Sequence, residues 1–548
     1  MPPPPRPSVA PSVLLLADPT AARAALLRGV SAMTRLLRPT LGPMPRTVAI
    51  ARQLGSQPPE ILDQAALIAR RTIQLADPFE DMGGKLIRHL VWRVFERTGD
   101  GTATAAVLAE ALLRAATRYI AAGGDPTALR RGLECGVPVA LAALRAQARP
   151  IELPEEIAQV VIGGLGDAEL ADTLGQIVDA VGPDGSIVVE DAQGTTTGYE
   201  YLDGMRWEQG GYVSTFLLKP GEHIARVVNP RLFITDFDLD SADQLLPAVE
   251  ACVAAGDRTL FVIATEIRDS AIGLLVVNRE RAVLDNVLAV RAPSHGSDRT
   301  AILDDIAVAT GGRCLARERQ DRLTEVTSAD LGRARQAWAN RTAFAVLGGQ
   351  GDRSAIRQRM AEARAQIDDL AGDEVARDRI RERIGKLAGT AAAIRVGAAT
   401  EIEQAERKVR VASAVKTARA AVRSGVVPGG GLALLACVPA IQALAERTSG
   451  DEGVGLRTLS DALAEPMAVI ARNAGLESGP IVAEATVRGA SWLFDVVHGE
   501  WVDAWAAGIV DPLEVVASAL EAATSAVAPA LSAEVLIHRR NAPLALEP

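Results

Sequence analysis

A chain of 548 residues is too long for a single hydrophobic core, so we expect several domains. The composition, 48% hydrophobic but only 3% aromatic, excludes a largely disordered protein and favours helix-rich packing over an aromatic-cored β-sandwich. The formal net charge of −10 and the lack of a basic stripe argue against nucleic acid or an anionic membrane as a partner.

Cysteine usage points to a reduced, cytoplasmic setting. Cys135, Cys252, Cys314 and Cys437 are scattered without CxxC spacing, so neither a disulfide framework nor a zinc site is indicated. The proline-rich start is followed by a short apolar run at 13–16, which predicts a tail and then a strand rather than a signal peptide. No uninterrupted apolar run reaches about 18 residues, so no membrane-spanning segment is expected.

Helices are predicted for most of the chain up to about residue 145. Apolar residues recur at intervals of three and four, the spacing of a helix with one buried face. The windows are residues 22–41, 65–75, 82–95 and 104–119. From residue 150 to about 201 helix mixes with short strands, which indicates a small connecting domain.

Strands and helices alternate between residue 204 and about residue 391, which predicts a doubly wound or similar layered module. The strands are expected at 232–235, 259–264 and 287–290, and the helices at 241–255, 270–281 and 299–310. A charged pair of helices, 353–370 and 373–387, is expected to present a solvated face. After Gly397 the chain is predicted to be helical to near its end, apart from a glycine-rich turn at 425–431.

The stretch Thr98-Gly99-Asp100-Gly101-Thr102-Ala103-Thr104 opens the helix at 104–119. Glycines, hydroxyls and free N–H groups at the positive end of a helix dipole can bind an anion. Asp100 would repel that anion unless a divalent metal lay between them. The alternative is an ordinary cap before an alanine-rich core helix. If the two ends of the chain pair into one domain, Asp100 comes near the turn at 429–431.

Further motifs decide between these alternatives. They are Thr40-Leu41-Gly42-Pro43, Phe79-Glu80-Asp81-Met82-Gly83, Gly99-Asp100-Gly101-Thr102, Gly204-Met205, Val396-Gly397-Ala398-Ala399-Thr400-Glu401, residues 425–431 and Gly508-Ile509-Val510-Asp511-Pro512. In order and approximate spacing, the chain resembles the bacterial group I chaperonins, the GroEL-type family, from about residue 21 to about residue 530.

The resemblance implies a multidomain α and α/β fold. A helical equatorial domain would occupy 1–146 and 424–548, and a small mixed intermediate domain 147–203 and 392–423. An α/β apical, polypeptide-binding domain would be inserted between them at 204–391. This division agrees with the alternation of helical and mixed patterns along the chain.

The resemblance also implies an ATP site in which Asp100 holds Mg²⁺ on the phosphates. Hydroxyl and backbone groups would bind the phosphates and border the sugar, at Gly101, Thr102, Thr104, Leu41, Gly42 and Pro43. Gly430 would lie over the nucleotide, and Ile509 and Asp511 would contact base and ribose. A metal-bridged triphosphate, close glycine backbone and a ribose-binding carboxylate suit nucleotide recognition.

The hydrolytic residues depart from the family pattern. Ser413, in Val411-Ala412-Ser413-Ala414, stands where the family has the Asp that activates water. A hydroxyl cannot accept a proton near pH 7 as a carboxylate does, and losing a general base costs about 10²–10⁴ in rate. Asp63 retains a second water-facing carboxylate. We therefore expect weakened ATP binding and slow or impaired hydrolysis.

Other positions of the nucleotide site differ as well. Ala103 replaces a phosphate-site threonine, and Met44-Pro45-Arg46 replaces Lys-Gly-Arg. Asp495-Val496-Val497 replaces Asn-Ala-Ala on the base side and is bulkier and charged. His295 is a loop histidine without a sequence partner, and no catalytic or metal role is expected for it.

In the apical region, the resemblance implies an apolar groove for non-native polypeptides and for the mobile loop of a lid co-chaperonin. The matching residues are Phe216, Leu217, Leu246, Val249, Ile272, Leu275, Val276 and Val277. The alternative is that these are ordinary core residues of an α/β layer. Gly204 matches one family hinge, while Gly389-Thr390 replaces the Gly-Gly of the return hinge.

Two functions follow from this resemblance. The first is a chaperonin ring subunit that binds non-native polypeptides and assists their folding with ATP and magnesium. The second is a non-hydrolysing scaffold, or a silent subunit in rings mixed with an active paralogue. Ser413 favours the second, whereas the retained Asp100 and Asp511 favour nucleotide binding in either case.

Overall fold

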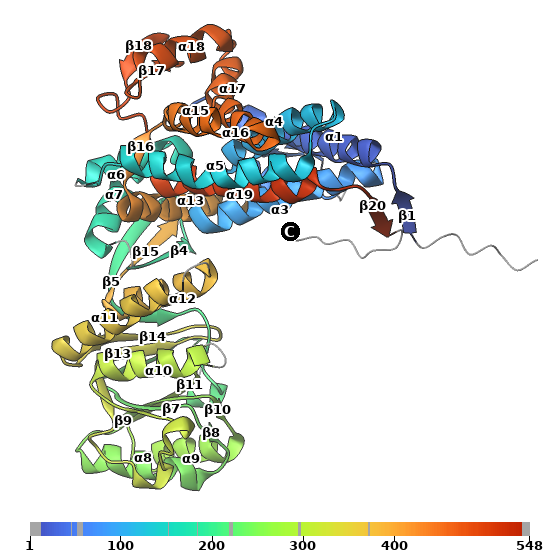
Figure 1. The fold of residues 1–548 in the computed structure, drawn as a ribbon. Helices are drawn as coiled ribbons and strands as arrows, with labels where there is room; N and C mark the ends of the chain where they lie inside the picture. The colour runs from blue at the N-terminus through green and yellow to red at the C-terminus, as the bar shows by residue number, and fades with distance from the viewer. Residues whose placement is uncertain are drawn as a thin grey trace, which may run out of the picture. The chain divides into compact units, whose positions relative to one another are not determined.

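The computed structural model describes residues 13–44, 46–51, 59–151, 153–182, 185–218, 223–293, 297–370 and 373–539. The expectations for the proline-rich start, for His295 and for the tail at 541–548 lie outside these residues. The chain forms two compact units (Figure 1). We call Met1–Asp179 with Val409–Pro548 the terminal unit, and Ala180–Lys408 the central unit. The five-segment division proposed above stays a prediction.

The terminal unit combines elements from both ends of the chain. Its first part holds β1 (Val13–Leu16), α1 (Pro19–Leu37), β2 (Val48–Ile50), β3 (Glu60–Leu62), α2 (Ala65–Arg71), α3 (Pro78–Thr98), α4 (Thr102–Ala121), α5 (Pro126–Gln147), α6 (Pro154–Leu165) and α7 (Ala168–Val181), whose last residues enter the central unit. Its second part begins within α13 (Glu401–Ser424) and continues with β16 (Val426–Pro428), α14 (Leu432–Leu435), α15 (Val438–Arg447), α16 (Gly450–Leu463), α17 (Glu465–Asn473), α18 (Ser478–Arg488), β17 (Trp492–Asp495), β18 (Glu500–Asp503), β19 (Val510–Pro512), α19 (Leu513–Leu531) and β20 (Leu536–Arg539).

Three helices of this unit start with the same Asp-Pro pair. Asp18, Asp77 and Asp125 are the N-caps of α1, α3 and α5, and each carboxylate accepts the backbone N–H two residues on at 2.8 Å. The following proline occupies the first helical position, where no N–H is needed. These caps fix where the helices begin.

The helix α19 lies in the core of the terminal unit. Of the described residues, it alone forms a helix long and apolar enough to cross a membrane by length and composition. It packs against α4, α5 and α3, and Ala519, Leu520 and Ala523 are fully buried there. We therefore assign α19 as a core helix.

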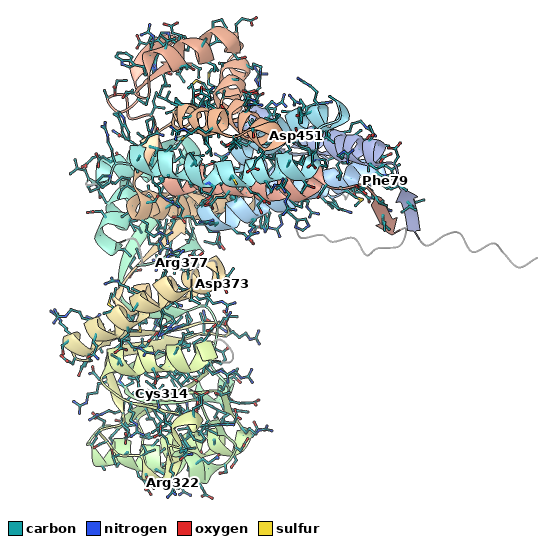
Figure 2. The ribbon with its side chains drawn as sticks, viewed as in Figure 1. Phe79, Cys314, Arg322, Asp373, Arg377 and Asp451 are labelled. Atoms are coloured by element: carbon teal, nitrogen blue, oxygen red, sulfur yellow. The ribbon has the colours of Figure 1, made fainter. Side chains whose placement is uncertain are left out.

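Asp451, labelled in Figure 2, connects neighbouring helices of this unit. It accepts hydrogen bonds from the Tyr119 hydroxyl (2.9 Å) and the Asp125 N–H (2.6 Å).

The two ends of the chain also meet directly. Strand β1 pairs antiparallel with β20. Within the second part of the unit, β16 pairs antiparallel with β19, with Val427 opposite Asp511. The region after Gly397 was expected to be helical, but it also holds these strands and the hairpin of β17 with β18. The difference arises because these strands have only three or four residues each, too few to show a period of two.

The central unit is built on one sheet in the order β11-β9-β7-β13-β14-β5-β15-β4, with β12 beside β7 and β6 beside β13. Its strands are β4 (Ser186–Asp191), β5 (Gly198–Trp207), β6 (Ala225–Val228), β7 (Arg231–Thr235), β9 (Thr259–Ala264), β11 (Asn286–Arg291), β12 (Cys314–Leu315), β13 (Gly332–Ala339), β14 (Phe344–Gly349) and β15 (Thr390–Val396), and β8 (Asp238–Leu239) pairs with β10 (Glu266–Ile267) beside it. Its helices are α8 (Ala242–Ala254), α9 (Asp269–Glu280), α10 (Ser297–Thr310), α11 (Arg353–Asp369) and α12 (Glu374–Leu387).

Parallel strands β7, β9 and β11 are buried on both faces, as their continuous apolar sequences predict. Leu260 and Val262 of β9 pack with residues of α8 and α9, whereas Phe261 and Ile263 pack with residues of α10. Strands therefore lie between two helical layers, as the α/β pattern predicted.

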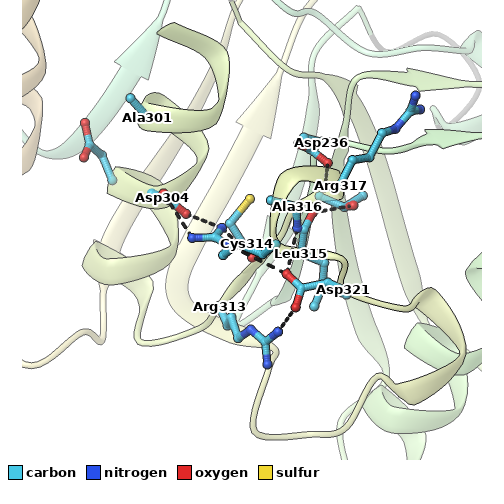
Figure 3. Close-up of polar contacts among 12 residues, drawn as sticks. Asp236, Ala301, Asp304, Arg313, Cys314, Leu315, Ala316, Arg317 and Asp321 are labelled. Atoms are coloured by element: carbon cyan, nitrogen blue, oxygen red, sulfur yellow. Dashed lines mark hydrogen bonds and ion pairs between the residues drawn. The ribbon is translucent and has the colours of Figure 1, made fainter. Parts of the chain in front are cut away.

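Ion pairs fix the segment that follows β12 (Figure 3). Asp321 accepts the Ala316 N–H at 2.9 Å and pairs with Arg313, while Arg319 pairs with Asp304 at 2.7 Å. Burial, aided by nearby carboxylates, raises the pKa of the Cys314 thiol to about 12. This thiol stays protonated near neutral pH and is a structural residue rather than a nucleophile.

Candidate functional site

The terminal unit contains a pocket of about 740 Å³. It is lined by segments far apart in the sequence, among them 40–43, 99–104, 428–434, 493–498 and 507–511. The structure brings all the predicted nucleotide and hydrolytic residues into its wall. These are Leu41, Gly42, Pro43, Asp63, Asp100, Gly101, Thr102, Thr104, Ser413, Gly430, Ile509 and Asp511. The individual roles of these residues stay predictions.

The turn between α3 and α4 presents Asp100 to the pocket. Gly99 and Gly101 both have left-handed backbone conformations, with φ of +75° and +81°. A Cβ atom on Gly101 would lie 2.7 Å from Cγ1 of Val515, so a side chain would be strained and would also clash. The Gly101 N–H donates to Oδ1 of Asp100 at 2.6 Å, which orients the carboxylate.

The first turn of α4 supplies backbone donors beside Asp100. The first helical hydrogen bond of this turn runs from the Ala105 N–H to the Gly101 carbonyl at 2.9 Å. The N–H groups of Thr102, Ala103 and Thr104 precede it, and the N-cap Gly101 has no side chain to cap them. Such donors at a helix N-terminus can bind phosphate oxygens.

Asn473, at the end of α17, holds the loop of Leu41, Gly42 and Pro43. Its Nδ2 donates to the carbonyls of Arg38 and Leu41, both at 2.8 Å, and Arg46 donates to its carbonyl at 2.9 Å. Asn473 was not predicted from the sequence. An Asn-Ala-Gly sequence at a helix end is typical of a C-cap, so nothing in the sequence pointed to the loop.

Two carboxylates share the interior of the pocket. Removal from bulk water raises the pKa of Asp100, although its side chain remains exposed to the pocket. The same cause, reinforced by the charge of Asp100, raises the pKa of Asp511 to about 7. Each group therefore favours a neighbouring positive charge, and a cation between them would lower both pKa values.

The donor set suits magnesium rather than a metal held by the protein alone. Among the described residues, no group of three or more His, Cys, Asp or Glu side chains could bind a metal ion. Mg²⁺ is commonly held by one or two carboxylates while water and substrate phosphates complete its shell. Asp100 with Asp511 nearby meets that requirement.

Asp63 is not free to act as a base in this structure. Its Oδ2 accepts a hydrogen bond from Nη2 of Arg410 at 2.8 Å, in an ion pair whose side chains are 26% and 29% exposed. A carboxylate oxygen that accepts this hydrogen bond is not available to a water molecule while the ion pair is closed. Arg410, on α13, is a pocket residue that the sequence analysis missed.

Ser413 and its neighbours on α13 bind the end of α3. The Ser413 hydroxyl donates to the Gly99 carbonyl at 2.5 Å, and the Thr417 hydroxyl donates to the Thr98 carbonyl at 3.2 Å. Lys416 Nζ donates to the Glu96 carbonyl at 3.0 Å. We call Ser413, Lys416 and Thr417 the α3 clasp. It satisfies carbonyls that a helix end leaves without partners.

On the base side, Asp495 is used within the hairpin of β17 and β18. It accepts the N–H groups of Val497 and His498 at 2.8 and 3.4 Å, and Nδ1 of His498 lies 2.6 Å from its Oδ2. Although burial opposes it, the hydrogen bonds from His498 and the backbone lower the pKa of Asp495, and the same pair raises the pKa of His498. The carboxylate noted in the sequence is therefore hydrogen-bonded within its own hairpin.

The predicted polypeptide-binding residues divide into two groups. Leu217, Val249, Ile272 and Leu275 are buried in the core between the sheet and helices α8 and α9. For these residues the alternative interpretation as ordinary core is correct in this conformation, because a buried side chain cannot contact a bound chain. Phe216 is 74% exposed, Val277 and Leu246 are also exposed, and Val276 is partly buried.

The predicted hinge glycines are hydrogen-bonded neighbours in the central unit. The Gly204 N–H donates to the Gly389 carbonyl at 2.9 Å. Gly204 lies within β5 with φ of +146°, and Gly389 precedes β15 with φ of +71°. The antiparallel pairing of strands β5 and β15 begins at the residues that adjoin this contact.

Comparison with known proteins gives two results. Residues 33–541 match the model of the TCP-1/cpn60 chaperonin family. Among solved structures, the chain is similar to the chaperonin gp146 from bacteriophage EL 2 (Pseudomonas aeruginosa), crystallised in the presence of ATP-BeFx. For crystal form I the TM-score is 0.76 at 19% identity, over 96% of this chain and 99% of the phage chain. For crystal form II it is 0.65 at the same identity and coverage.

Proposed function

We propose that this chain, which belongs to the TCP-1/cpn60 chaperonin family, is a subunit of a ring. It would bind non-native polypeptides and magnesium-ATP but hydrolyse ATP slowly. The family and the predicted multidomain α and α/β fold are confirmed by the family match and by the phage chaperonin structure. Nucleotide use, ring assembly and slow hydrolysis are our proposals. The observation that supports nucleotide binding is the convergence of all the predicted contact residues on one pocket.

Each part of a magnesium nucleotide would find a group of suitable chemistry. The backbone donors of Thr102, Ala103 and Thr104 would bind phosphate oxygens, and the loop fixed by Asn473 would border them. Asp100 would hold the magnesium ion, which supplies charge neutralisation on the phosphates when bound. The gp146 structures were obtained with an ATP analogue, which agrees with this use of the fold.

Slow hydrolysis follows from the two positions that would handle a water molecule. Ser413 cannot take up a proton near pH 7, and its hydroxyl is engaged with the Gly99 carbonyl. Asp63 is held by Arg410. These contacts favour, as the alternative function, a non-hydrolysing scaffold or a silent subunit of a mixed ring.

The test is magnesium-dependent ATP turnover by the full chain beside a Ser413→Asp variant. We expect the unmodified chain to turn over slowly, and the variant to gain about 10²-fold, because a carboxylate repelled by the Gly99 carbonyl turns towards the pocket. Turnover by the unmodified chain at a rate equal to the variant would overturn impaired hydrolysis. No turnover by either protein, with nucleotide still bound, would establish the non-hydrolysing alternative.

For polypeptide capture, we propose the exposed residues Phe216, Leu246 and Val277, with Val276 beside them. A Phe216→Ser variant should bind a chemically denatured test protein several-fold more weakly. Val228→Ser is the matched control, because Val228 is also exposed in the central unit, on β6. Equal binding by both variants would remove Phe216 from this role. Capture of a lid co-chaperonin by the same residues would be lost in parallel.

A further inference from the structure

The pocket contains more acidic than basic side chains, although its proposed ligand is a polyanion. Its acidic residues are Asp63, Asp100, Asp495, Glu500 and Asp511. The basic groups among the described residues of its wall are Arg410 and His498. His498 is engaged with Asp495 in the hairpin at 2.6 Å. Arg410 therefore supplies the permanent positive charge that a phosphate chain could reach.

Arg410 lies on the side of α13 that faces the turn at Gly99–Gly101, where the phosphates would bind. It precedes Ser413 by three residues, and residues three apart share a helix face. Ser413 touches Gly99, the residue before Asp100, at 2.5 Å. A nucleotide with its base near the hairpin of β17 and β18 and its metal at Asp100 would extend its last phosphate towards this part of α13.

The bond between Arg410 and Asp63 can be exchanged. Both side chains keep about a quarter of their surface exposed, and a partly solvated ion pair contributes little net free energy. A phosphate carries more charge than a carboxylate and offers the planar guanidinium two parallel hydrogen bonds. Binding of such a group would therefore compete successfully with Asp63.

We propose that Arg410 binds the terminal phosphate of a nucleoside triphosphate and leaves Asp63 when it does so. This inference rests on the proposed nucleotide function of the pocket. A diphosphate would leave the ion pair intact. The exchange makes the pair a sensor of the third phosphate. Once a bound triphosphate has released Asp63, slow hydrolysis rests on Ser413, which cannot take up a proton near pH 7.

The experiment compares the affinity of the full chain for a magnesium-bound, non-hydrolysable ATP analogue and for magnesium-ADP, by calorimetry. Arg410→Ala should weaken triphosphate binding about 10- to 100-fold and diphosphate binding less than about threefold. Arg410→Lys should fall between, because a point charge remains but the fork is lost. Asp63→Asn should strengthen triphosphate binding a few-fold, because the charged partner at 2.8 Å from the guanidinium is removed.

Arg407→Ala is the matched control. Arg407 lies one turn earlier on α13 and pairs with Glu403, outside the pocket wall. It should change neither affinity. Equal losses of triphosphate and diphosphate affinity in Arg410→Ala, or none, would overturn the inference. If that variant does not fold, Arg410→Lys and Asp63→Asn decide alone. Failure of the unmodified chain to bind either nucleotide would overturn the proposed function itself, and the two failures are thus distinguishable.

Discussion

The turn at Gly99–Gly101 and the stretch of α13 from Arg410 to Thr417 are joined by the hydrogen bond from Ser413 to Gly99, yet their polar groups point to different partners. The turn leaves an exposed carboxylate and backbone donors facing the pocket. The α13 stretch directs its hydroxyls and its ammonium group to the carbonyls of α3 and pairs its guanidinium with Asp63. One wall of the pocket thus presents polar groups to its interior, while the polar side chains of the neighbouring wall are engaged in contacts within the protein.

The largest effect is expected from a side chain at the turn. Gly101→Ala should lower the free energy of unfolding by about 2–4 kcal/mol, because the left-handed backbone is strained and the new Cβ meets Val515 at 2.7 Å. Gly123→Ala is the control, since Gly123 is also left-handed but has no neighbour within 4 Å of a Cβ, and it should lose only about 1 kcal/mol. Urea unfolding measures both. Equal losses would show that the close packing of the turn is unimportant.

Removing the charge of Asp100 tests the binding side directly. Asp100→Asn should weaken magnesium-ATP binding roughly 100-fold, because the ion loses its charged ligand. Chelating magnesium should weaken ATP binding by the unmodified chain by a similar factor. It should cause little further loss of ATP affinity in the variant. A variant that still responds fully to magnesium would place the ion elsewhere.

A smaller effect is expected from the support of the loop at Leu41. Asn473→Ala removes two hydrogen bonds to the loop and should weaken nucleotide binding about tenfold. Asn473→Asp keeps the size of the side chain but replaces the donor by an acceptor. It should therefore bind nucleotide no more tightly than Asn473→Ala. If alanine binds nucleotide normally, the loop does not depend on this residue.

The smallest effect is a dependence on pH. The pKa of Asp511 is about 7 in the folded chain, above its ordinary value near 3.8, so folding favours the protonated carboxyl. Its stabilising contribution is complete below pH 4 and is lost as the pH rises through 7. Without magnesium, the melting temperature should therefore fall by about 2–4 °C between pH 5 and pH 8 from this group. Asp511→Asn should remove the part of this fall in melting temperature that Asp511 causes. If the melting temperature of the variant depends on pH as that of the unmodified chain does, Asp511 is not the group responsible.

Local features were predictable from the sequence because their causes are local. The glycines around Asp100 and the helical spacing of α4 both act within a few residues. The family motifs added which of these segments share a pocket. The buried strands β7 and β9 were also recognisable, since an apolar run between turns leaves few alternatives.

Partnerships across long separations were not predictable. Asn473 lies 432 residues from Leu41, and Arg410 lies 347 residues from Asp63. Neither an asparagine nor an arginine in a sequence indicates which distant residue it will contact. On α8 and α9 the same aliphatic residues fit a core or an exposed groove equally well, and only packing shows that Val249 and Leu275 are inside. The hairpin of β17 and β18 was missed because its strands are so short.

The α3 clasp also links the hydrolytic position to the stability of the α3 end. A Ser413→Asp substitution would remove the hydrogen bond to the Gly99 carbonyl and turn the new carboxylate away from that oxygen, which costs about 1–3 kcal/mol of stability before any catalytic benefit is realised. Lys416 and Thr417 would continue to hold the helix in place. A Ser413→Asp protein therefore begins with a weaker connection between α13 and the end of α3, unless other residues of α13 are changed with it.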